Sequence, residues 1–246
     1  MGDCYLNSKK WALRHPAKAW QFYRGNKLPL QKKMLFSTLE WARFDTKTLE
    51  QFEIFWQEIL RMEQSGFQQG NSHGNHISST FAKWLYLLIR ATKPEVMVET
   101  GVAHGYSSSI ILQAMHQNKQ GTLYSIDLPG HDTNANYNLQ ADAIGHVVPN
   151  DLRSRWQLIR GDVREELPPL LDRLQQIDCF FHDSDHSYEN MSFEFQLADK
   201  HLRNGGFLIS DDVYKNKAYA EFMDEKKYPS AYFTKGACCR KTFGKT

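Results

Sequence analysis

Apolar and polar positions change their period along the chain, and from Pro94 onwards short apolar runs alternate with longer amphipathic stretches. The short runs predict strands and the longer stretches predict helices, because side chains alternate along a strand and recur every 3.6 residues on a helix. The expected strands are 96–99, 122–126, 156–160, 177–182 and 207–210, followed by 231–234 and 238–242. The expected helices are 107–118, 164–175, 188–203 and 217–226. Strands joined through helices imply right-handed crossovers, so the sequence predicts an α/β fold: a doubly wound, mostly parallel, seven-stranded sheet with helices on both faces.

The part of the chain that precedes this alternation is predicted to be helical. Apolar residues recur at three- and four-residue steps over 48–61, which predicts an amphipathic helix, and a second helix is expected over 79–90. Between them, residues 68–76 form a polar, glycine-containing stretch that is typical of a loop. We therefore expect a helical N-terminal extension over residues 1–78 and a main domain over residues 79–246.

Composition narrows the class of protein. Hydrophobic residues make up 41% of the 246 residues and charged residues 24%, which excludes a disordered or low-complexity chain. The longest apolar run has six residues, Trp84 to Ile89, whereas a membrane-spanning helix needs roughly 18. With a mean hydropathy of −0.58, we expect no segment to cross a membrane.

The net charge of +2 conceals an uneven distribution. Eight Lys or Arg against one acid give residues 1–33 a charge of +7, so the remaining residues carry −5. Aromatic residues interleave with these charges, which suits an anionic membrane surface, a nucleic acid or an acidic partner, or an arm that packs on its own domain or on a second subunit of a homodimer. The small charge of the whole chain argues against a dedicated nucleic-acid binder.

Cysteine usage and the N-terminus indicate a reducing compartment. Cys4, Cys179, Cys238 and Cys239 lack the paired C-x-x-C spacing of a zinc site, and no disulfide framework is expected. The first residues lack the apolar region of a signal peptide, so we expect a cytoplasmic protein.

Candidate chemistry lies where the predicted strands end, because ligands of a doubly wound sheet bind beyond the carboxyl ends of its strands. The first strand runs into the sequence ETGVAHG, residues 99–105, and continues into a helix at Tyr106 and Ser107. Gly101 and Gly105 allow a tight turn and the close approach of a ligand, and Ser107 with the two serines after it is expected to cap the helix. The spacing differs from the G-x-G-x-x-G of a pyrophosphate-binding turn, and the acid at its start would repel phosphates. A cationic or zwitterionic ligand suits this turn better.

Two further acids close the next predicted strands. Asp127 follows the second strand, where a carboxylate can accept both hydrogen bonds of a ribose diol. Asp162 follows the third, where it can accept from an exocyclic amine. Each acid alone is equally explained as a helix cap or turn residue, and their joint order along the chain is the more specific signal.

Residues 79–242 resemble class I S-adenosylmethionine-dependent methyltransferases. The resemblance rests on ETGVAHG at 99–105, DCFFHDSDHSYE at 178–189 and GGFLISDD at 205–212. The last two segments look like the branch that includes macrolide-sugar O-methyltransferases and cephalosporin-hydroxylase-like proteins. The resemblance implies a Rossmann-like fold that binds S-adenosylmethionine, with the methionine part on the glycine turn, the ribose at Asp127 and the adenine amine near Asp162. The implied cofactor-binding residues are Glu99, Gly101, Gly105, Tyr106, Ser107, Asp127, Asp162 and Asp183.

Three carboxylates are expected to converge at adjacent strand ends: Asp183 after the fourth strand, and Asp211 with Asp212 after the fifth. This all-oxygen set favours Mg²⁺ with open positions for a substrate hydroxyl. Such an ion would lower the pKa of the hydroxyl and hold it in line with the methyl group, giving Asp183 a part in catalysis. In the related catechol family a lysine three residues after the first metal aspartate is the base, and here that position is His186. A histidine can take the proton near neutral pH, or His186 only orders the loop 184–188.

Two other histidines and one long connection complete the candidates. His182 should point away from Asp183, towards the core or a helix. His104 lies inside the glycine turn, as a cofactor contact or a solvent-facing residue. Residues 129–151 exceed a normal strand-to-helix connection, and we expect them to cover the substrate or to carry a short helix over 138–144.

These observations predict a Mg²⁺-assisted O-methyltransferase that methylates a hydroxyl of a small molecule such as a sugar, polyketide or diol. Two alternatives stay open: an oxidoreductase or hydroxylase-like enzyme of the same fold, and a non-catalytic binding domain that uses the basic N-terminal arm. The missing G-x-G-x-x-G argues against a nicotinamide enzyme, and the absence of a 2-His-1-carboxylate spacing argues against mononuclear iron.

Overall fold

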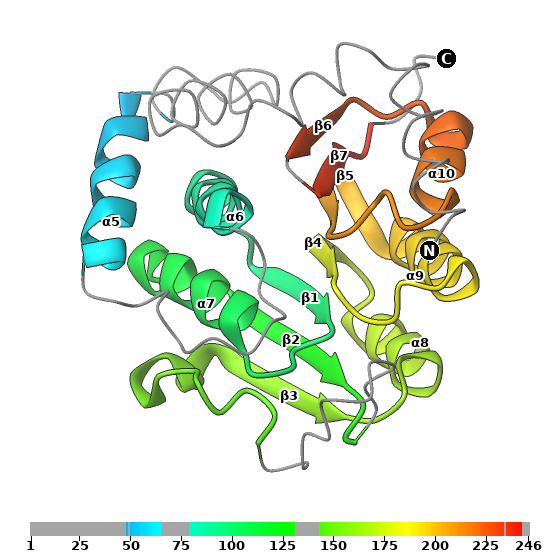
Figure 1. The fold of residues 1–246 in the computed structure, drawn as a ribbon, viewed down its shortest axis with the longest axis horizontal. Coiled ribbons are helices and arrows are strands. Elements are labelled where there is room, and N and C mark those ends of the chain that lie inside the picture. The colour runs from blue at the N-terminus through cyan, green and yellow to red at the C-terminus, as the bar shows by residue number, and fades with distance from the viewer. Residues whose placement is uncertain (1–47, 49, 65–78, 131–142, 234, 243–246) are drawn as a thin grey trace.

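The computed structural model describes residues 48, 50–64, 79–130, 143–233 and 235–242, and its core is one seven-stranded sheet in the order β3-β2-β1-β4-β5-β7-β6 (Figure 1). The strands are β1 (Val96–Thr100), β2 (Thr122–Asp127), β3 (Trp156–Arg160), β4 (Ile177–His182), β5 (Leu202–Ser210), β6 (Ser230–Phe233) and β7 (Gly236–Arg240). Strands β1 to β5 pair in parallel, and β7 is antiparallel to both of its neighbours. The predicted doubly wound α/β fold is confirmed.

Helices cover both faces of the sheet. They are α5 (Phe52–Gln64), α6 (Ser79–Thr92), α7 (Tyr106–Asn118), α8 (Val163–Leu174), α9 (Tyr188–His201) and α10 (Ala218–Lys226), with a 3₁₀ turn η1 (Asn150–Arg155) before β3. Helices α6 and α7 lie on one face and α8, α9 and α10 on the other, with α5 outside α6 (Figure 1). Parallel neighbours require such crossovers, because a hairpin can join only antiparallel strands.

The sheet separates two hydrophobic cores. Met97 and Val98 are neighbours on β1, yet Met97 packs into the core under α5, α6 and α7, while Val98 packs into the core under α8, α9 and α10. Both side chains are fully buried. A strand covered on both faces therefore consists of consecutive apolar residues, which is why the sequence shows short apolar runs rather than alternation.

Helix α5 is the described part of the predicted extension, and it is joined to the main core. Phe55 and Trp56 belong to the same hydrophobic cluster as the buried face of α6. The Glu58 carboxylate accepts hydrogen bonds from the Tyr86 hydroxyl at 2.7 Å and from Arg90 Nε and Nη2 at 2.9 and 3.0 Å. The basic arm, residues 1–33, and the predicted loop 68–76 lie outside the described residues.

Most predicted element boundaries hold within a few residues, but two strands differ. Strand β5 begins at Leu202 rather than 207, because Leu202 pairs with Ile177 before a register shift and the polar stretch after it is not typical of a strand. Strand β7 ends at Arg240, whereas the expected strand was 238–242. The alternative short helix over 138–144 lies almost wholly outside the described residues.

Three of the cysteines are described, and all are buried free thiols: Cys179, Cys238 and Cys239. Burial raises the thiol pKa of Cys179 and Cys239 to about 12. The expectation that they form no disulfide is confirmed for these residues.

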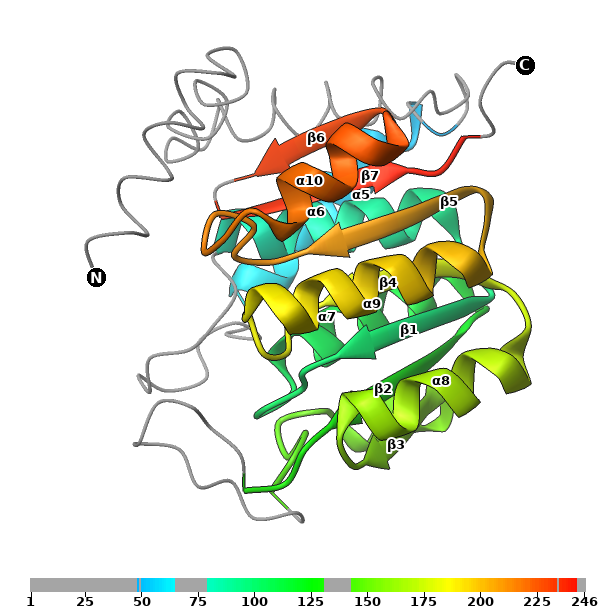
Figure 2. The same ribbon diagram turned by 90° about the vertical axis from the view of Figure 1, so that its right-hand side faces the viewer.

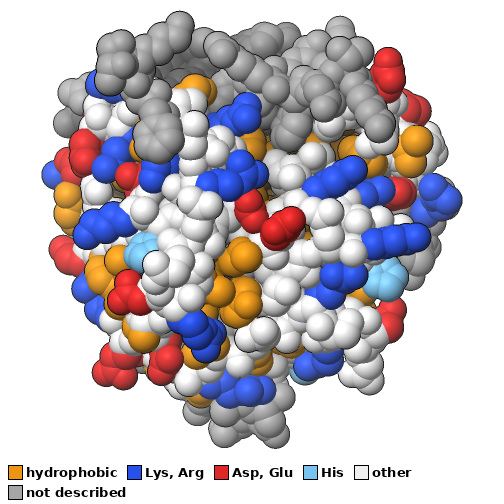
Figure 3. All heavy atoms as spheres, turned by 180° about the vertical axis from the view of Figure 1, so that it is seen from behind, with side chains coloured by type: hydrophobic (Ala, Val, Ile, Leu, Met, Phe, Trp, Pro, Cys, Tyr) orange, Lys and Arg blue, Asp and Glu red, His pale blue; other side chains and the backbone are white. Residues whose placement is uncertain are grey.

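Within the described ranges, no helix has the combination of length and apolar character that crossing a bilayer requires. On the face opposite to that of Figure 1, Lys and Arg side chains intermingle with Asp and Glu rather than forming a field of one sign (Figure 3).

Candidate active site

The acids singled out in the sequence lie at one edge of the sheet, where its parallel strands end. The arrowheads of β1 and β5 point to the same side of the molecule (Figure 2). Strands β1 and β4 are neighbours, but the chain continues from β1 to β2 on one side and from β4 to β5 on the other. This reversal is the topological switch point at which doubly wound sheets bind ligands.

The glycine turn after β1 has the backbone conformation that its glycines predict. Gly101 has φ 82° and Gly105 has φ 96°, both in the left-handed region. A Cβ on Gly101 would lie 2.1 Å from the carbonyl oxygen of Asp183, and one on Gly105 would lie 2.8 Å from the Cα of Gly145. The tight turn is confirmed, and the close approaches that the structure records are to the chain's own atoms: backbone at Gly101, and backbone together with the Val148 side chain at Gly105.

Glu99, at the start of this turn, is fully buried and bonded to three hydroxyls. Ser107 donates to Oε1 at 2.6 Å, and Ser108 and Ser125 donate to Oε2 at 2.6 and 2.7 Å. Burial raises the pKa of Glu99 to about 7, although the three hydroxyls each lower it. The carboxyl therefore joins β1, β2 and the first turn of α7.

The expectation that Ser107 and the two following serines cap the helix is wrong. Helix α7 begins at Tyr106 after Gly105, and no side chain caps its amides. Ser107 and Ser108 are turned to Glu99 instead, and Ser109 donates to the Gly105 carbonyl at 2.7 Å. A buried carboxylate is a stronger acceptor for a hydroxyl than a neutral partner, which favours this arrangement.

Asp127 ties the end of β2 to the glycine turn. Its Oδ2 accepts from the backbone amides of Val102 at 3.0 Å and Ala103 at 2.6 Å. Burial raises the pKa of Asp127 despite these bonds. The carboxyl is partly exposed beside the turn, and its role in ribose binding stays a prediction.

Asp162 is the N-cap of α8. Its Oδ1 accepts from the Arg164 amide at 2.7 Å, which confirms the helix-cap interpretation. The side chain remains partly exposed at the end of β3, so contact with an adenine amine is compatible with capping and stays a prediction.

Asp183, Asp211 and Asp212, the acidic cluster, follow the neighbouring ends of β4 and β5, near enough for their charges to interact. Burial raises the pKa of Asp183 well above its usual range, and the negative charges of Asp211, Glu99 and Asp212 raise it further. Burial and Asp212 raise the pKa of Asp211 to about 6. Carboxyl groups crowded in this way require a proton or a cation between them.

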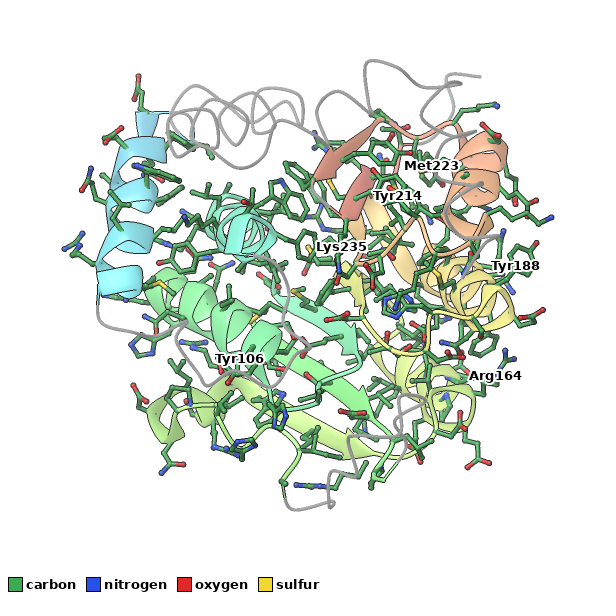
Figure 4. All side chains as sticks on the ribbon, in the orientation of Figure 1. Tyr106, Arg164, Tyr188, Tyr214, Met223 and Lys235 are labelled. Carbon is green, nitrogen blue, oxygen red and sulfur yellow. The ribbon has the colours of Figure 1, made fainter. Side chains whose placement is uncertain are left out.

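Two lysines that the sequence reasoning missed lie beside this acidic cluster. Asp212 forms an ion pair with Lys215 at 2.9 Å, and Lys235 Nζ lies 3.8 Å from its other oxygen. These ammonium groups hold the pKa of Asp212 below its usual value, although burial alone would raise it. Lys235 extends from the turn between β6 and β7 towards the ends of β4 and β5 (Figure 4). Lys215 is three residues from Asp212 and could have been found from that spacing, whereas Lys235 left no local signal.

The acidic cluster fits a divalent cation in donor type and in charge. All donors are carboxylate oxygens, and the mutual repulsion of Asp183 and Asp211 would be relieved by Mg²⁺. Among the described residues, however, no three acidic, histidine or cysteine side chains are grouped around one point, and Asp212 is directed towards Lys215. Asp212 would therefore have to exchange its lysine partner for the ion.

His186 lies on the loop after β4, next to the acidic cluster. Its Nε2 is 3.9 Å from Asp183 Oδ1, and its carbonyl accepts from Asn216 Nδ2 at 2.8 Å. Burial, together with the neighbouring His182 ring and the positive charge of Lys215, lowers the pKa of His186 to about 3. The ring is therefore neutral at pH 7 and faces the acids, so both the base and the loop-ordering interpretations remain open.

His182 points to the opposite side of β4, as predicted, and contacts a residue that the sequence reasoning missed. Its Nδ1 lies 2.8 Å from Glu194 Oε2, and both side chains are fully buried. The available signal was the position of Glu194 within α9, between Met191 and Phe195 on the buried face of the helix. An acid on an apolar helix face needs a buried partner.

The described end of the long connection packs on the glycine turn. The Gly145 amide donates to the Ala103 carbonyl at 2.9 Å, and the Val147 amide donates to the His104 carbonyl at 3.1 Å. His104 Nδ1 lies 3.5 Å from His146 Nδ1, so His104 faces this segment. Residues 131–142 lie outside the described part of the chain, and the substrate-covering role stays a prediction.

Comparisons with known proteins agree with this geometry. Residues 98–213 match the model of a family described as a methyltransferase domain. This range begins within β1 and ends just after Asp212, so it includes every candidate residue of the site.

Solved structures with the same fold include several methyltransferases. The SAM-bound O-methyltransferase TomG of Streptomyces achromogenes is 18% identical, with a TM-score of 0.54 over 74% of this chain and 89% of its own. The SAH-bound methyltransferase of Podospora anserina is 13% identical, with a TM-score of 0.55 over 81% of this chain and 97% of its own.

A curated relative has been found in a virus. An uncharacterized protein of Acanthamoeba polyphaga mimivirus is 28% identical over 124 residues, which are 47% of this chain and 50% of the relative. The match thus spans about half the length of that protein.

Proposed function

We propose that this chain methylates a hydroxyl of a small molecule with S-adenosylmethionine as the methyl donor, because residues 98–213 match the model of a methyltransferase domain and the sheet is doubly wound. The observation that carries the proposal is the position of the glycine turn at the switch point, tied by Glu99 and Asp127 and facing the acids of β4 and β5. A sulfonium cation is attracted to such a negative edge, whereas a dinucleotide is not.

The residues of the turn support recognition of the donor. The left-handed glycines bring the backbone of the turn against the Asp183 loop, and Asp127 is held by two amides on the same side. In our proposal Asp127 accepts from the ribose hydroxyls, Asp162 faces the adenine, and the first turn of α7 at Tyr106 and Ser107 faces the methionine part.

In the transfer, an oxygen of the acceptor attacks the methyl carbon, the carbon–sulfur bond breaks and S-adenosylhomocysteine leaves. The proton of the hydroxyl must pass to a base, and we assign it to His186. The ring is neutral at pH 7, and the negative charge of Asp212, whose pKa is held below its usual value, would stabilise the imidazolium once it forms. His186→Gln should then lower turnover at neutral pH, and full turnover would return His186 to an ordering role.

We also propose that a divalent cation takes part in the reaction. Asp183, Asp211 and Asp212 are the residues that would hold Mg²⁺, and the ion would lower the pKa of a ligating hydroxyl. Support comes from the oxygen donors and from the repulsion between Asp183 and Asp211. Addition of a chelator and the substitution Asp211→Asn should each abolish turnover. Turnover that survives both would refute the proposed role of the metal ion.

Calorimetric titration with S-adenosylmethionine tests the proposal most directly. The wild-type protein should bind it, and Asp127→Asn should weaken binding by at least about tenfold, since charge-assisted bonds to a diol are lost. The exposed Asp151, on η1, provides a matched control, and Asp151→Asn should leave the affinity unchanged. No binding to wild type at high micromolar concentration would reject the proposal.

The acceptor class can be tested with a panel of sugars, catechols and other diols. The readout is the release of S-adenosylhomocysteine. Turnover on a diol supports O-methylation. Binding of S-adenosylmethionine without turnover on any member would favour the non-catalytic binding domain instead.

A further inference from the structure

A fully buried acid–histidine pair lies behind the acidic cluster. Glu194 is on α9 and His182 ends β4, and their side chains have no exposed surface. The pair is joined by a 2.8 Å contact between His182 Nδ1 and Glu194 Oε2. Since a carboxylate can only accept, Nδ1 carries the proton in this contact and Nε2 faces away from Glu194.

Glu194 collects hydrogen bonds from three parts of the site. Thr100, at the end of β1, donates to Oε2 at 2.5 Å. Ser184, on the loop after β4, and Asn190, in the first turn of α9, both donate to Oε1, Asn190 at 2.7 Å. Burial alone would raise the pKa of Glu194, but His182 and the hydroxyl donors outweigh it and hold the pKa below its usual value.

Such a pair is hard to explain by stability alone. The ring of His182 packs edge-on against Phe195, with the two ring centroids 5.4 Å apart, and neither side chain of the pair reaches solvent. Apolar residues of similar volume would fill the same space at equal or lower free energy, because desolvation of two ionisable groups offsets most of their attraction. The role of the pair is therefore better indicated by the contacts that it makes with the rest of the site.

Those contacts lead to the loop that carries Asp183 and His186. The rings of His182 and His186 meet edge-to-face, with centroids 5.1 Å apart and an angle of 71° between their planes. Asn190, bonded to Glu194, also donates to the Asp185 carbonyl at 2.9 Å. Glu194 thus holds the loop at Ser184 and Asp185, while His182 supports the ring of His186.

We propose that Glu194 and His182 are positioning residues that together fix the ring of His186, and the loop on which it lies, against the acidic cluster. The catalytic part of this inference rests on the proposed function, since His186 is a base only if methyl transfer occurs. The structural part concerns the orientation of His186 and can be measured without turnover.

Glu194→Gln is the first variant. Glu194 accepts four hydrogen bonds, whereas the single carbonyl of Gln has only two lone pairs, so part of the network must open. The matched control is Glu189→Gln, the same change at an exposed position of α9. A second variant, His182→Gln, keeps a donor for Glu194 but removes the ring that supports His186.

Long-range ¹H–¹⁵N spectra of histidine-labelled protein read out the result directly. In wild type, His182 should show the Nδ1–H tautomer. Glu194→Gln and His182→Gln should both shift the ring signals of His186, and Glu189→Gln should leave them in place. Unchanged His186 signals in both variants, with native spectra elsewhere, would overturn the proposal, as would an equal shift in Glu189→Gln.

A double-mutant cycle tests the catalytic part. Misplacing a base typically costs about tenfold to hundredfold in kcat, so Glu194→Gln should lower kcat by that factor with KM nearly unchanged. In a His186→Gln background the same change should cost less than about twofold, and equal losses in both backgrounds would show that Glu194 acts independently of His186. If the wild-type protein turns over no acceptor, the proposed function fails, but the spectra still test whether Glu194 and His182 position His186.

Discussion

Replacing Glu99 by Gln removes a buried charge while keeping the shape of the side chain. The carboxyl is fully buried and accepts from Ser107, Ser108 and Ser125. A Gln carbonyl can keep the bonds from Ser108 and Ser125, and its amide can donate to Ser107 if that hydroxyl rotates. The variant therefore changes little except the ability to ionise.

The magnitude follows from the pKa. Burial raises the pKa of Glu99 from 4.5 to about 7, so folding favours the protonated form. The resulting stability is fully present below pH 4.5 and is lost as the pH rises through 7. At 1.36 kcal/mol for each pKa unit, wild type should lose about 2.5 kcal/mol from this group between pH 5 and pH 8.5.

Urea unfolding at pH 5, 7 and 8.5 measures this difference. Between pH 5 and pH 8.5, the free energy of unfolding of Glu99→Gln should rise by about 2.5 kcal/mol relative to that of wild type, because Gln does not titrate. Glu95→Gln, the same change at an exposed position just before β1, should show no such trend. A difference between Glu99→Gln and wild type that is constant with pH would refute the reasoning, since it would show that Glu99 is ionised throughout.

Three further predictions concern the scaffold of the site. Gly101→Ala should destabilise the fold by about 3 kcal/mol in urea unfolding, because a Cβ at positive φ would meet the Asp183 backbone; a loss under 1 kcal/mol would show that the turn can relax. Glu58→Gln should cost about 2 kcal/mol and make α5 more sensitive to limited proteolysis, since a charged bond to Arg90 is lost; unchanged cleavage would contradict this docking role. Asp162→Ala should cost about 1 kcal/mol as a lost helix cap, and Asp162→Asn should not; equal stability losses in the two variants would argue against capping.

Much of the fold could be predicted from the sequence because its signals are local. Strands β3 and β4 were predicted to the residue, from short apolar runs bounded by polar residues. The glycine turn was predicted from Gly101 and Gly105, whose conformation depends only on their own backbone. The start of β5 was missed, since Leu202 is placed by its pairing with Ile177 and the polar and glycine residues 203–206 that follow it lack a strand pattern.

The candidate site was predicted less completely. The proximity of Asp183 and Asp211 followed from the rule that parallel strands end at one edge, because the residues before them, His182 and Ser210, pair with each other, whereas the described residues hold no group of three acids around one point. The partners of the serines after Gly105 were predicted wrongly, because helix capping is a local rule and Glu99 competes with it. Lys235 was not predicted at all, since it reaches Asp212 from another hairpin.

The sequence by itself determined the order of strands and helices, the turn after β1 and the presence of an acid at the end of each central strand, because these depend on residues within a few positions of one another. Which side chains those acids contact depended on the tertiary structure. Thr100 and Glu194 are 94 residues apart and bond at 2.5 Å, and no periodicity along the chain encodes such a contact. Packing of α9 against β4 creates it, by burying an acid beside hydrogen-bonding residues of β1, β4 and the loop after β4.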